Sequence, residues 1–161
     1  MSCCANKICA LALSGLLFLL AFSVLSLEAE GEPIGSITAI EGEVYLFHNG
    51  NTAAFQAMLA DPIYLYDHIQ TEKGGRVQIL FQDESLLNLA ENTAIQITEH
   101  IYSPEENRRS AVIKLLMGRV RVIVGRYFSG PGSKYTICTP NKIIELEKGH
   151  CIVDADAGLI Q

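Results

Sequence analysis

The sequence predicts a single all-β domain of about ten short, mainly antiparallel strands that form a sandwich or a β-roll. Two observations predict this class. Apolar and polar residues alternate in short runs, and turn signals recur about every 8 to 12 residues. The clearest example is residues 61–97, where alternating runs are separated by the Gly-Gly pair at 74–75 and by a polar corner at 83–85. An apolar helix at the N-terminus is expected to precede this domain.

The N-terminal helix is expected because residues 8–27 contain no charged side chain and follow a single lysine, Lys7. About twenty apolar residues lie at the boundary between a signal peptide and a membrane span. We expect residues 1–27 to be a cleaved signal peptide or, if retained, an anchor that holds the protein in the inner membrane. In both cases a polar linker (28–33) and the β domain (34–161) are expected to be exported.

The strands of the β domain are expected where β-branched and aromatic residues alternate with polar ones between Gly, Pro, Asn and Asp. Asn49-Gly50 is the strongest hairpin signal, since both central residues of such a turn need positive φ. Residues 51–60 fit either two helical turns or a strand with a bulge. We expect a polar loop over 103–109, with solvated arginines. In chain order, the strand signals lie at 34–40, 44–47, 67–71, 76–82, 87–89, 95–101, 111–117, 119–124, 135–137, 143–146 and 151–153.

The charge of the chain restricts its partners. Eighteen acidic residues against twelve basic ones give a formal net charge of −6 at pH 7, and every acidic residue lies after residue 27. Such a domain is not expected to bind nucleic acid through a general attraction to phosphate. It is also not expected to bind anionic lipid by charge alone. Contact with the membrane is therefore expected only through the N-terminal apolar segment.

Two cysteines remain in the exported part, Cys138 and Cys151, each within an alternating apolar run. An exported protein can keep a disulfide, and a bridge between neighbouring strands would add roughly 2–4 kcal/mol of stability. The alternative is that both are small buried hydrophobic side chains, as free cysteines often are. Both possibilities remain open from the sequence.

No catalytic residue, metal site or cofactor is predicted. The four histidines lie in separate segments, without the spacing of a zinc site. His150 and Cys151 are adjacent on a predicted strand and so point to opposite faces, which separates them as metal ligands or as a nucleophile pair. No glycine-rich phosphate loop leads into a helix. We therefore expect a protein that is not an enzyme.

Several ordered motifs resemble those of the FecR domain, an extracytoplasmic β-module of bacterial envelope proteins. Residues 66–71 (YDHIQT) resemble the Gly-Asp-x-Ile-x-Thr step of that family, with tyrosine in place of glycine. Residues 81–85 (FQDES) resemble its Phe-x-Asp-Gly-Ser corner, with glutamate in place of glycine. Residues 115–120 and 135–140 resemble a later glycine-containing strand and a Phe-x-Val-x-Thr-Pro segment. The resemblance covers about residues 35–155.

The resemblance implies a structural role for the matched residues, since none of them forms a known catalytic set in the family. Asp67 and Asp83 are expected to cap turns through hydrogen bonds from side chain to backbone, and Thr71 to do so more weakly. Gly118 matches the glycine of the family's strand of leucine, glycine and basic-valine residues. The resemblance also implies a module of the periplasm or the cell surface that takes part in binding or signalling.

We expect binding to a protein partner of the envelope, with two alternatives. A glycan-binding module would need exposed aromatic side chains, for which Tyr64 and Tyr66, expected on one face of a strand, are the best candidates. Tyr45 and Tyr127 are further candidates. A membrane-anchored component of a sigma-regulator-like signalling system would need residues 8–27 to be retained, but only seven residues precede that segment.

Overall fold

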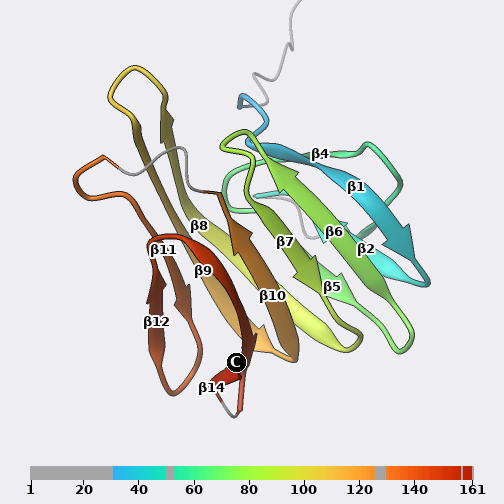
Figure 1. Ribbon diagram of the computed structural model, residues 1–161. Helices are drawn as coiled ribbons and strands as arrows, with labels where there is room; N and C mark the ends of the chain where they lie inside the picture. The colour runs from blue at the N-terminus through green and yellow to red at the C-terminus, as the bar shows by residue number, and fades with distance from the viewer. Residues whose placement is uncertain (1–30, 50–52, 126–129, 157, 161) are drawn as a thin grey trace, which may run out of the picture. The chain divides into compact units, whose positions relative to one another are not determined.

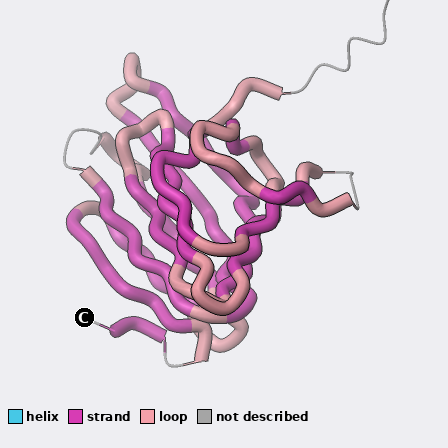
Figure 2. Tube along the Cα trace, turned by 90° about the vertical axis from the view of Figure 1, so that its right-hand side faces the viewer, coloured by secondary structure: helices cyan, strands magenta, loops and turns pink. Residues whose placement is uncertain are grey.

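The computed structural model describes residues 31–49, 53–125, 130–156 and 158–160 (Figure 1). These residues form strands, turns and loops, with no helix among them (Figure 2). In this part of the chain, accordingly, no helix is long and apolar enough to span a membrane. The helix predicted within residues 1–27 and the candidate Tyr127 lie outside the described residues.

The strands form two seven-stranded sheets, here named sheet A and sheet B (Figure 1). Sheet A contains, in the order of pairing, β14 (Gly158–Ile160), β13 (Gly149–Asp154), β10 (Arg119–Val124), β7 (Leu86–Leu89), β6 (Arg76–Phe81), β1 (Gly35–Glu41) and β4 (Pro62–Ile63). Sheet B contains β12 (Ile143–Leu146), β11 (Lys134–Cys138), β9 (Arg108–Met117), β8 (Thr93–Ser103), β5 (His68–Thr71), β2 (Val44–Phe47) and β3 (Phe55–Gln56).

The predicted all-β class is confirmed, and the two sheets are those of a sandwich. The described residues form fourteen strands, where about ten were expected. The additional ones include β3, β4 and β14, which are only two or three residues long and therefore carry no readable alternation. β9 and β11 pair in parallel, and every other pairing of the described strands is antiparallel.

The core lies between the sheets, because each strand turns alternate side chains inward. In β6 the inward residues are Val77, Ile79 and Phe81, all buried, while Arg76 and Leu80, which alternate with them, are exposed. The inward positions of the other central strands are also aliphatic or aromatic. The core is completed by Ile37, Val44, Leu46, Ile69, Leu87, Leu89, Ile95, Ile97, Ile113, Leu115, Val120, Val122, Tyr135, Ile137 and Val153.

Gly118 lies where the chain passes from β9 in sheet B to β10 in sheet A. Its φ is 82°, a left-handed conformation that glycine adopts without steric cost. A Cβ atom at this position would lie 2.4 Å from the carbonyl oxygen of Asn92 and 2.4 Å from Oγ1 of Thr93. This crossing between the sheets therefore requires glycine.

The segment after β3 joins the edge of sheet B to the edge of sheet A. The N–H of Ala57 donates to the carbonyl of Val44 at 2.9 Å, and the N–H of Ala60 donates to the carbonyl of Ile37 at 2.9 Å. The segment is thus hydrogen-bonded first to one sheet and then to the other. Of the two possibilities left open for residues 51–60, the strand is present at Phe55–Gln56, and the described residues of this segment form no helix.

Candidate binding surfaces

Tyr64 and Tyr66 lie in a turn between β4 and β5, not on one face of a strand as expected. The N–H of Asp67 donates to the carbonyl of Tyr64 at 3.2 Å, and Tyr66 has a φ of 72°. The expectation was wrong because the alternation of side chains holds only for extended backbone. Tyr66 is 47% exposed, whereas Tyr64 is half-buried.

Asp67 holds this turn and also contacts His48. Its Oδ2 accepts the N–H of Tyr64 at 2.8 Å, and its Oδ1 lies 3.0 Å from Nδ1 of His48. The backbone N–H of Asn49 adds a further hydrogen bond to the carboxylate. Burial raises the pKa of Asp67, and the hydrogen bonds from Tyr64 and His48 oppose that rise. The buried carboxylate therefore fixes the position of the His48 ring.

The imidazole of His48 lies between two aromatic rings. Its centroid is 5.8 Å from that of Phe55 and 5.4 Å from that of Tyr64, the latter in an edge-on geometry. Phe55 is 46% exposed, although it lies on the edge strand β3. We name His48, Phe55, Tyr64 and Tyr66 the aromatic surface. Its two exposed rings are supplied by Phe55 and Tyr66.

The aromatic surface continues along the chain into further exposed apolar side chains. Met58 and Leu59 follow Phe55 in the segment that joins the two sheets, and both are more than half exposed. Asp61 holds the turn that presents them, because its Oδ2 accepts the N–H of Met58 at 2.8 Å. Consecutive exposed apolar residues on an ordered segment are typical of an interaction site.

Thr71 is buried at the end of β5 and connects three segments. Its Oγ1 donates to the carbonyl of Ala90 at 2.6 Å and accepts the N–H of Thr93 at 3.0 Å. These bonds join the end of β5 to the turn between β7 and β8. The Thr71 hydroxyl therefore forms hydrogen bonds with a turn that is distant in sequence, and not with the turn that follows β5.

Asp83 lies at the corner between β6 and β7, where its Oδ1 accepts the N–H of Ser85 at 3.1 Å and the hydroxyl of Ser85 at 2.5 Å. The Ser85 hydroxyl in turn contacts the hydroxyl of Tyr135 on β11. On the other side of the carboxylate, Nη1 of Arg109 lies 3.9 Å from Oδ2, and Nε2 of His100 lies 4.0 Å from Oδ1. We name these five residues the buried polar cluster.

Arg109 corrects an expectation, because it was predicted on a solvated loop and is only 1% exposed. The β8–β9 hairpin is longer than expected, so that β8 extends to Ser103 and β9 begins at Arg108. Arg109 therefore points inward from a strand, and its Nη2 donates to the carbonyls of Gly125 and Glu147. The sequence offered no signal for this burial, since the partner Asp83 lies in another sheet.

The cluster is closed to solvent, and this changes the acidity of its members. Burial raises the pKa of the Tyr135 phenol, as does the nearby Asp83 carboxylate. Burial lowers the pKa of His100, while Asp83 opposes that change. Side chains this inaccessible cannot meet a substrate, so the cluster joins the two sheets rather than forming an active site.

Cys138 and Cys151 are free thiols on different sheets. They do not lie on neighbouring strands, which was the condition stated for a disulfide. Cys138 lies on β11 opposite Ile143, whereas Cys151 lies on β13 opposite Val122. Cys151 is buried in the core and Cys138 is half-buried. The alternative reading, of two small hydrophobic side chains, describes Cys151 well. Within the described part of the chain, no three His, Cys, Asp or Glu side chains are grouped as metal ligands.

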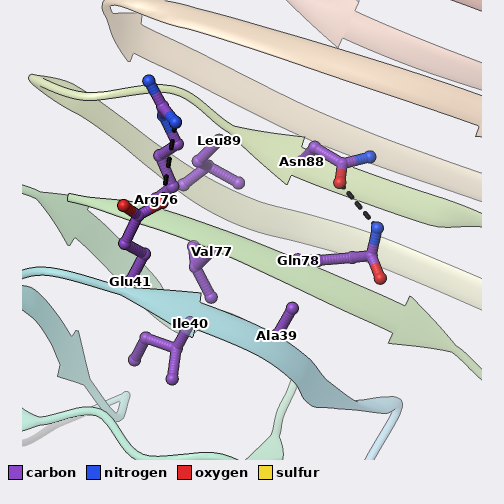
Figure 3. Close-up of a pocket in the computed structure, with 8 residues that line it drawn as sticks. All are labelled: Ala39, Ile40, Glu41, Arg76, Val77, Gln78, Asn88 and Leu89. Carbon is purple, nitrogen blue, oxygen red and sulfur yellow. Dashed lines mark hydrogen bonds and ion pairs between the residues drawn. The ribbon is translucent and has the colours of Figure 1, made fainter. Parts of the chain in front are cut away.

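The outer face of sheet A carries two adjoining shallow depressions, of about 320 and about 230 Å³. Both are lined by Arg76, Asn88 and Leu89. The first extends over β1 toward Glu41 (Figure 3), and the second extends over β10 toward Arg121. None of these residues was a candidate from the sequence, because only the register of five strands brings them together.

Two packed, mainly antiparallel sheets, joined by a buried polar cluster, define the class of the protein as a β-sandwich. The chain belongs to the FecR family: the family model described as "FecR protein" matches residues 67–161. The resemblance is thereby confirmed, although the match begins at Asp67 and extends to the last residue. FecR proteins are a regulatory, non-enzymatic family.

Two further comparisons complete this description. Among solved structures, one that matches is a "Cell surface anchoring domain", 26% identical, with a TM-score of 0.40. The match covers 42% of this chain and 88% of that chain. No curated protein matches the chain.

Proposed function

We propose that this FecR-family protein is an exported, non-catalytic module of the bacterial cell envelope that binds a protein partner through its aromatic surface. The observation that carries the proposal is the exposure of two rings on ordered supports: Phe55, whose centroid lies 5.8 Å from that of the fixed His48 ring, and Tyr66, in the turn that Asp67 holds. Aromatic side chains on a rigid support bind with little loss of conformational entropy and are enriched where binding energy is concentrated. The apolar side chains of Met58 and Leu59 enlarge the area that a partner can cover.

Family membership supports the envelope location, and the apolar segment at 8–27 supports export. We propose that residues 1–27 direct export and are then removed, and that residues 28–33 lead into the β domain. Mass measurement of the mature protein tests this. A mass that corresponds to a chain starting after residue 27 supports a secreted or periplasmic form. The mass of the full-length chain would support an inner-membrane anchor and a signalling role.

Site-specific photo-crosslinking in the native cell tests the protein-binding role. A photo-reactive amino acid at Tyr66 is expected to give one defined protein adduct, and Phe55→Ser is expected to abolish it. The same probe at Lys114, exposed on β9, is the matched control. An adduct that forms equally from Lys114, or that survives Phe55→Ser, would contradict the proposal.

Glycan binding is the second candidate, and the exposure of Tyr66 favours it, since tyrosine rings can stack on sugars. In a polysaccharide pull-down, Tyr64→Ala and Tyr66→Ala would then abolish binding while protein adducts formed from a probe at Phe55 persist. The opposite pattern, in which both tyrosine variants retain as much polysaccharide as the wild type while the protein adducts are lost, supports the protein partner.

A further inference from the structure

The outer face of sheet A has an order that follows from the strand register. Outward residues of adjacent strands lie directly opposite one another, with Cβ atoms about 4.5–5.5 Å apart. Gln78 on β6 is opposite Asn88 on β7, and Asn88 is opposite Arg121 on β10. Arg121 is in turn opposite Ile152 on β13. A row of polar side chains therefore crosses the face at right angles to the strands.

Hydrogen bonds give this row a direction. Oγ1 of Thr38 donates to Oε1 of Gln78 at 3.1 Å, and Nε2 of Gln78 donates to Oδ1 of Asn88 at 2.8 Å. The amide nitrogen of Asn88 points away from Gln78 (Figure 3). Each hydrogen bond in the row polarises the next one. At the far end of the row, the side-chain N–H groups of Asn88 lie next to the guanidinium group of Arg121. Neither of these donors has a hydrogen-bond acceptor among the described residues.

The charge of this face is opposite to that of the chain. Its three arginines are Arg76, Arg119 and Arg121, whereas the chain as a whole carries −6. Arg76 pairs with Glu41 at 3.5 Å, and Arg119 pairs with Asp154 at 3.1 Å. Arg121 makes no ion pair within the described part of the chain. Exposed pairs contribute about 0–1 kcal/mol, so a ligand carboxylate can replace the protein carboxylate at Arg76 or Arg119 at little cost.

A third feature of the face is apolar. Leu80, Leu86 and Ile123 are also opposite one another in the register and form a second row beside the polar one. A ligand that binds along this face therefore contacts three kinds of group: amides that both donate and accept hydrogen bonds, guanidinium groups and the row of aliphatic side chains. The hydroxyl groups of a ligand can also both donate and accept hydrogen bonds, so they can pair with the side-chain amides in both directions. A ligand that carries only anionic groups can accept hydrogen bonds but cannot donate them.

We propose that the outer face of sheet A binds an acidic polysaccharide, with Asn88 and Arg121 together holding a sugar carboxylate. Arginine binds carboxylate through two parallel N–H donors, and the Asn88 amide supplies a third from the neighbouring strand. Gln78 and Thr38 continue the polar row for the hydroxyl groups of the next sugar units. This surface contains none of the residues of the aromatic surface, so the two proposals succeed or fail separately.

The test is binding of the full-length protein in detergent to polygalacturonate, measured by isothermal titration calorimetry. Arg121→Gln is expected to weaken binding about tenfold or more, since hydrogen bonds to a charged group are the strong ones. Arg121→Lys keeps the charge but loses the planar fork, and is expected to weaken binding several-fold. Arg108→Gln, which alters another exposed arginine on sheet B, is the matched control and should bind as the wild type does.

Four other ligands and conditions decide the ligand class. Binding should weaken as salt is raised, and neutral dextran should bind far more weakly than polygalacturonate. Equal binding of poly-glutamate would overturn the sugar specificity, and equal binding of polyphosphate would show a general anion surface. Absence of polygalacturonate binding, or binding unchanged in both Arg121 variants, would overturn the proposal. Unchanged unfolding midpoints of these variants establish that any loss is not a loss of fold.

Discussion

Nδ1 of His48 lies 3.0 Å from Oδ1 of Asp67, and this contact joins an accessible ring to a carboxylate that is completely buried. The same carboxylate accepts the N–H of Tyr64, so one side chain fixes both the turn and the ring that packs against it. When Asp67 is ionised, its carboxylate only accepts hydrogen bonds, so this contact then needs a proton on Nδ1 of His48. The geometry of the aromatic surface therefore depends on the protonation state of Asp67.

Asp67 predicts a pH dependence of stability. Burial raises its pKa above the ordinary value of 3.8, so the folded state binds this proton more tightly than the unfolded state. The resulting stabilisation is complete below pH 3.8 and is lost as pH rises through the raised pKa. Asparagine does not titrate. The free energy of unfolding of the wild type, relative to Asp67→Asn, should therefore fall between pH 3 and pH 7 in urea titrations. A difference that grows with pH would contradict this assignment.

Gly118 predicts a large effect of a single methyl group. Gly118→Ala combines a left-handed φ with a Cβ that would lie 2.4 Å from two oxygen atoms, so we expect a loss of about 3 kcal/mol or more. Gly74→Ala is the matched control, because Gly74 has a φ of 74° but open space around its Cβ position. It should cost only about 1–2 kcal/mol. Equal losses in denaturant unfolding would show that the space around Gly118 is not restrictive.

Asp83 and Arg109 predict strong energetic coupling in the buried polar cluster. Removal of either charge leaves the other buried without the opposite charge that faces it, so Asp83→Asn and Arg109→Met should each cost about 3–5 kcal/mol. The double variant leaves neither charge, and its loss should be clearly smaller than the sum. The matched control is the cycle for Glu41 and Arg76, whose side chains are 71% and 67% exposed and should couple by less than about 1 kcal/mol. Additive losses at Asp83 and Arg109 would show that the two charges do not interact.

The sequence predicts the sandwich because its central strands alternate strictly, as Val77, Ile79 and Phe81 do in β6. Alternation cannot predict Tyr64 and Tyr66 correctly, since a positive φ at Tyr66 and the hydrogen bonds to Asp67 turn the backbone between them. The alternation of apolar and polar residues also does not predict the burial of Arg109. Burial of that side chain is set by a tertiary contact with a corner of the other sheet.

The outer face of sheet A shows the same limit for a binding surface. Gln78, Asn88 and Arg121 each look like an ordinary solvated residue in the sequence. Their common row exists only because β6, β7 and β10 pair with one particular register. A shift of one residue would turn these side chains into the core. Polar rows of this kind can therefore be found only once the pairing of the strands is known.

The two cysteines predict a difference in thiol reactivity. Cys151 is buried, and burial raises its pKa, so it should contain little thiolate and react with Ellman's reagent only after unfolding. Cys138 is half-buried and should react in the folded protein, though more slowly than a free thiol in solution. The measurement uses the full chain with Cys3, Cys4 and Cys9 replaced by serine.

Cys138→Ser supplies the control for this measurement. The variant should lose the reaction of the folded protein and retain one thiol in guanidinium chloride. Each sheet supplies one of the two cysteines, and their strand partners are Ile143 for Cys138 and Val122 for Cys151, so neither thiol is held against the other. Two thiols should therefore be counted in the unfolded protein even after purification without reductant. A count of zero, restored to two by reduction, would show that the cysteines are bridged and that β11 and β13 lie closer together at this point than the structure places them.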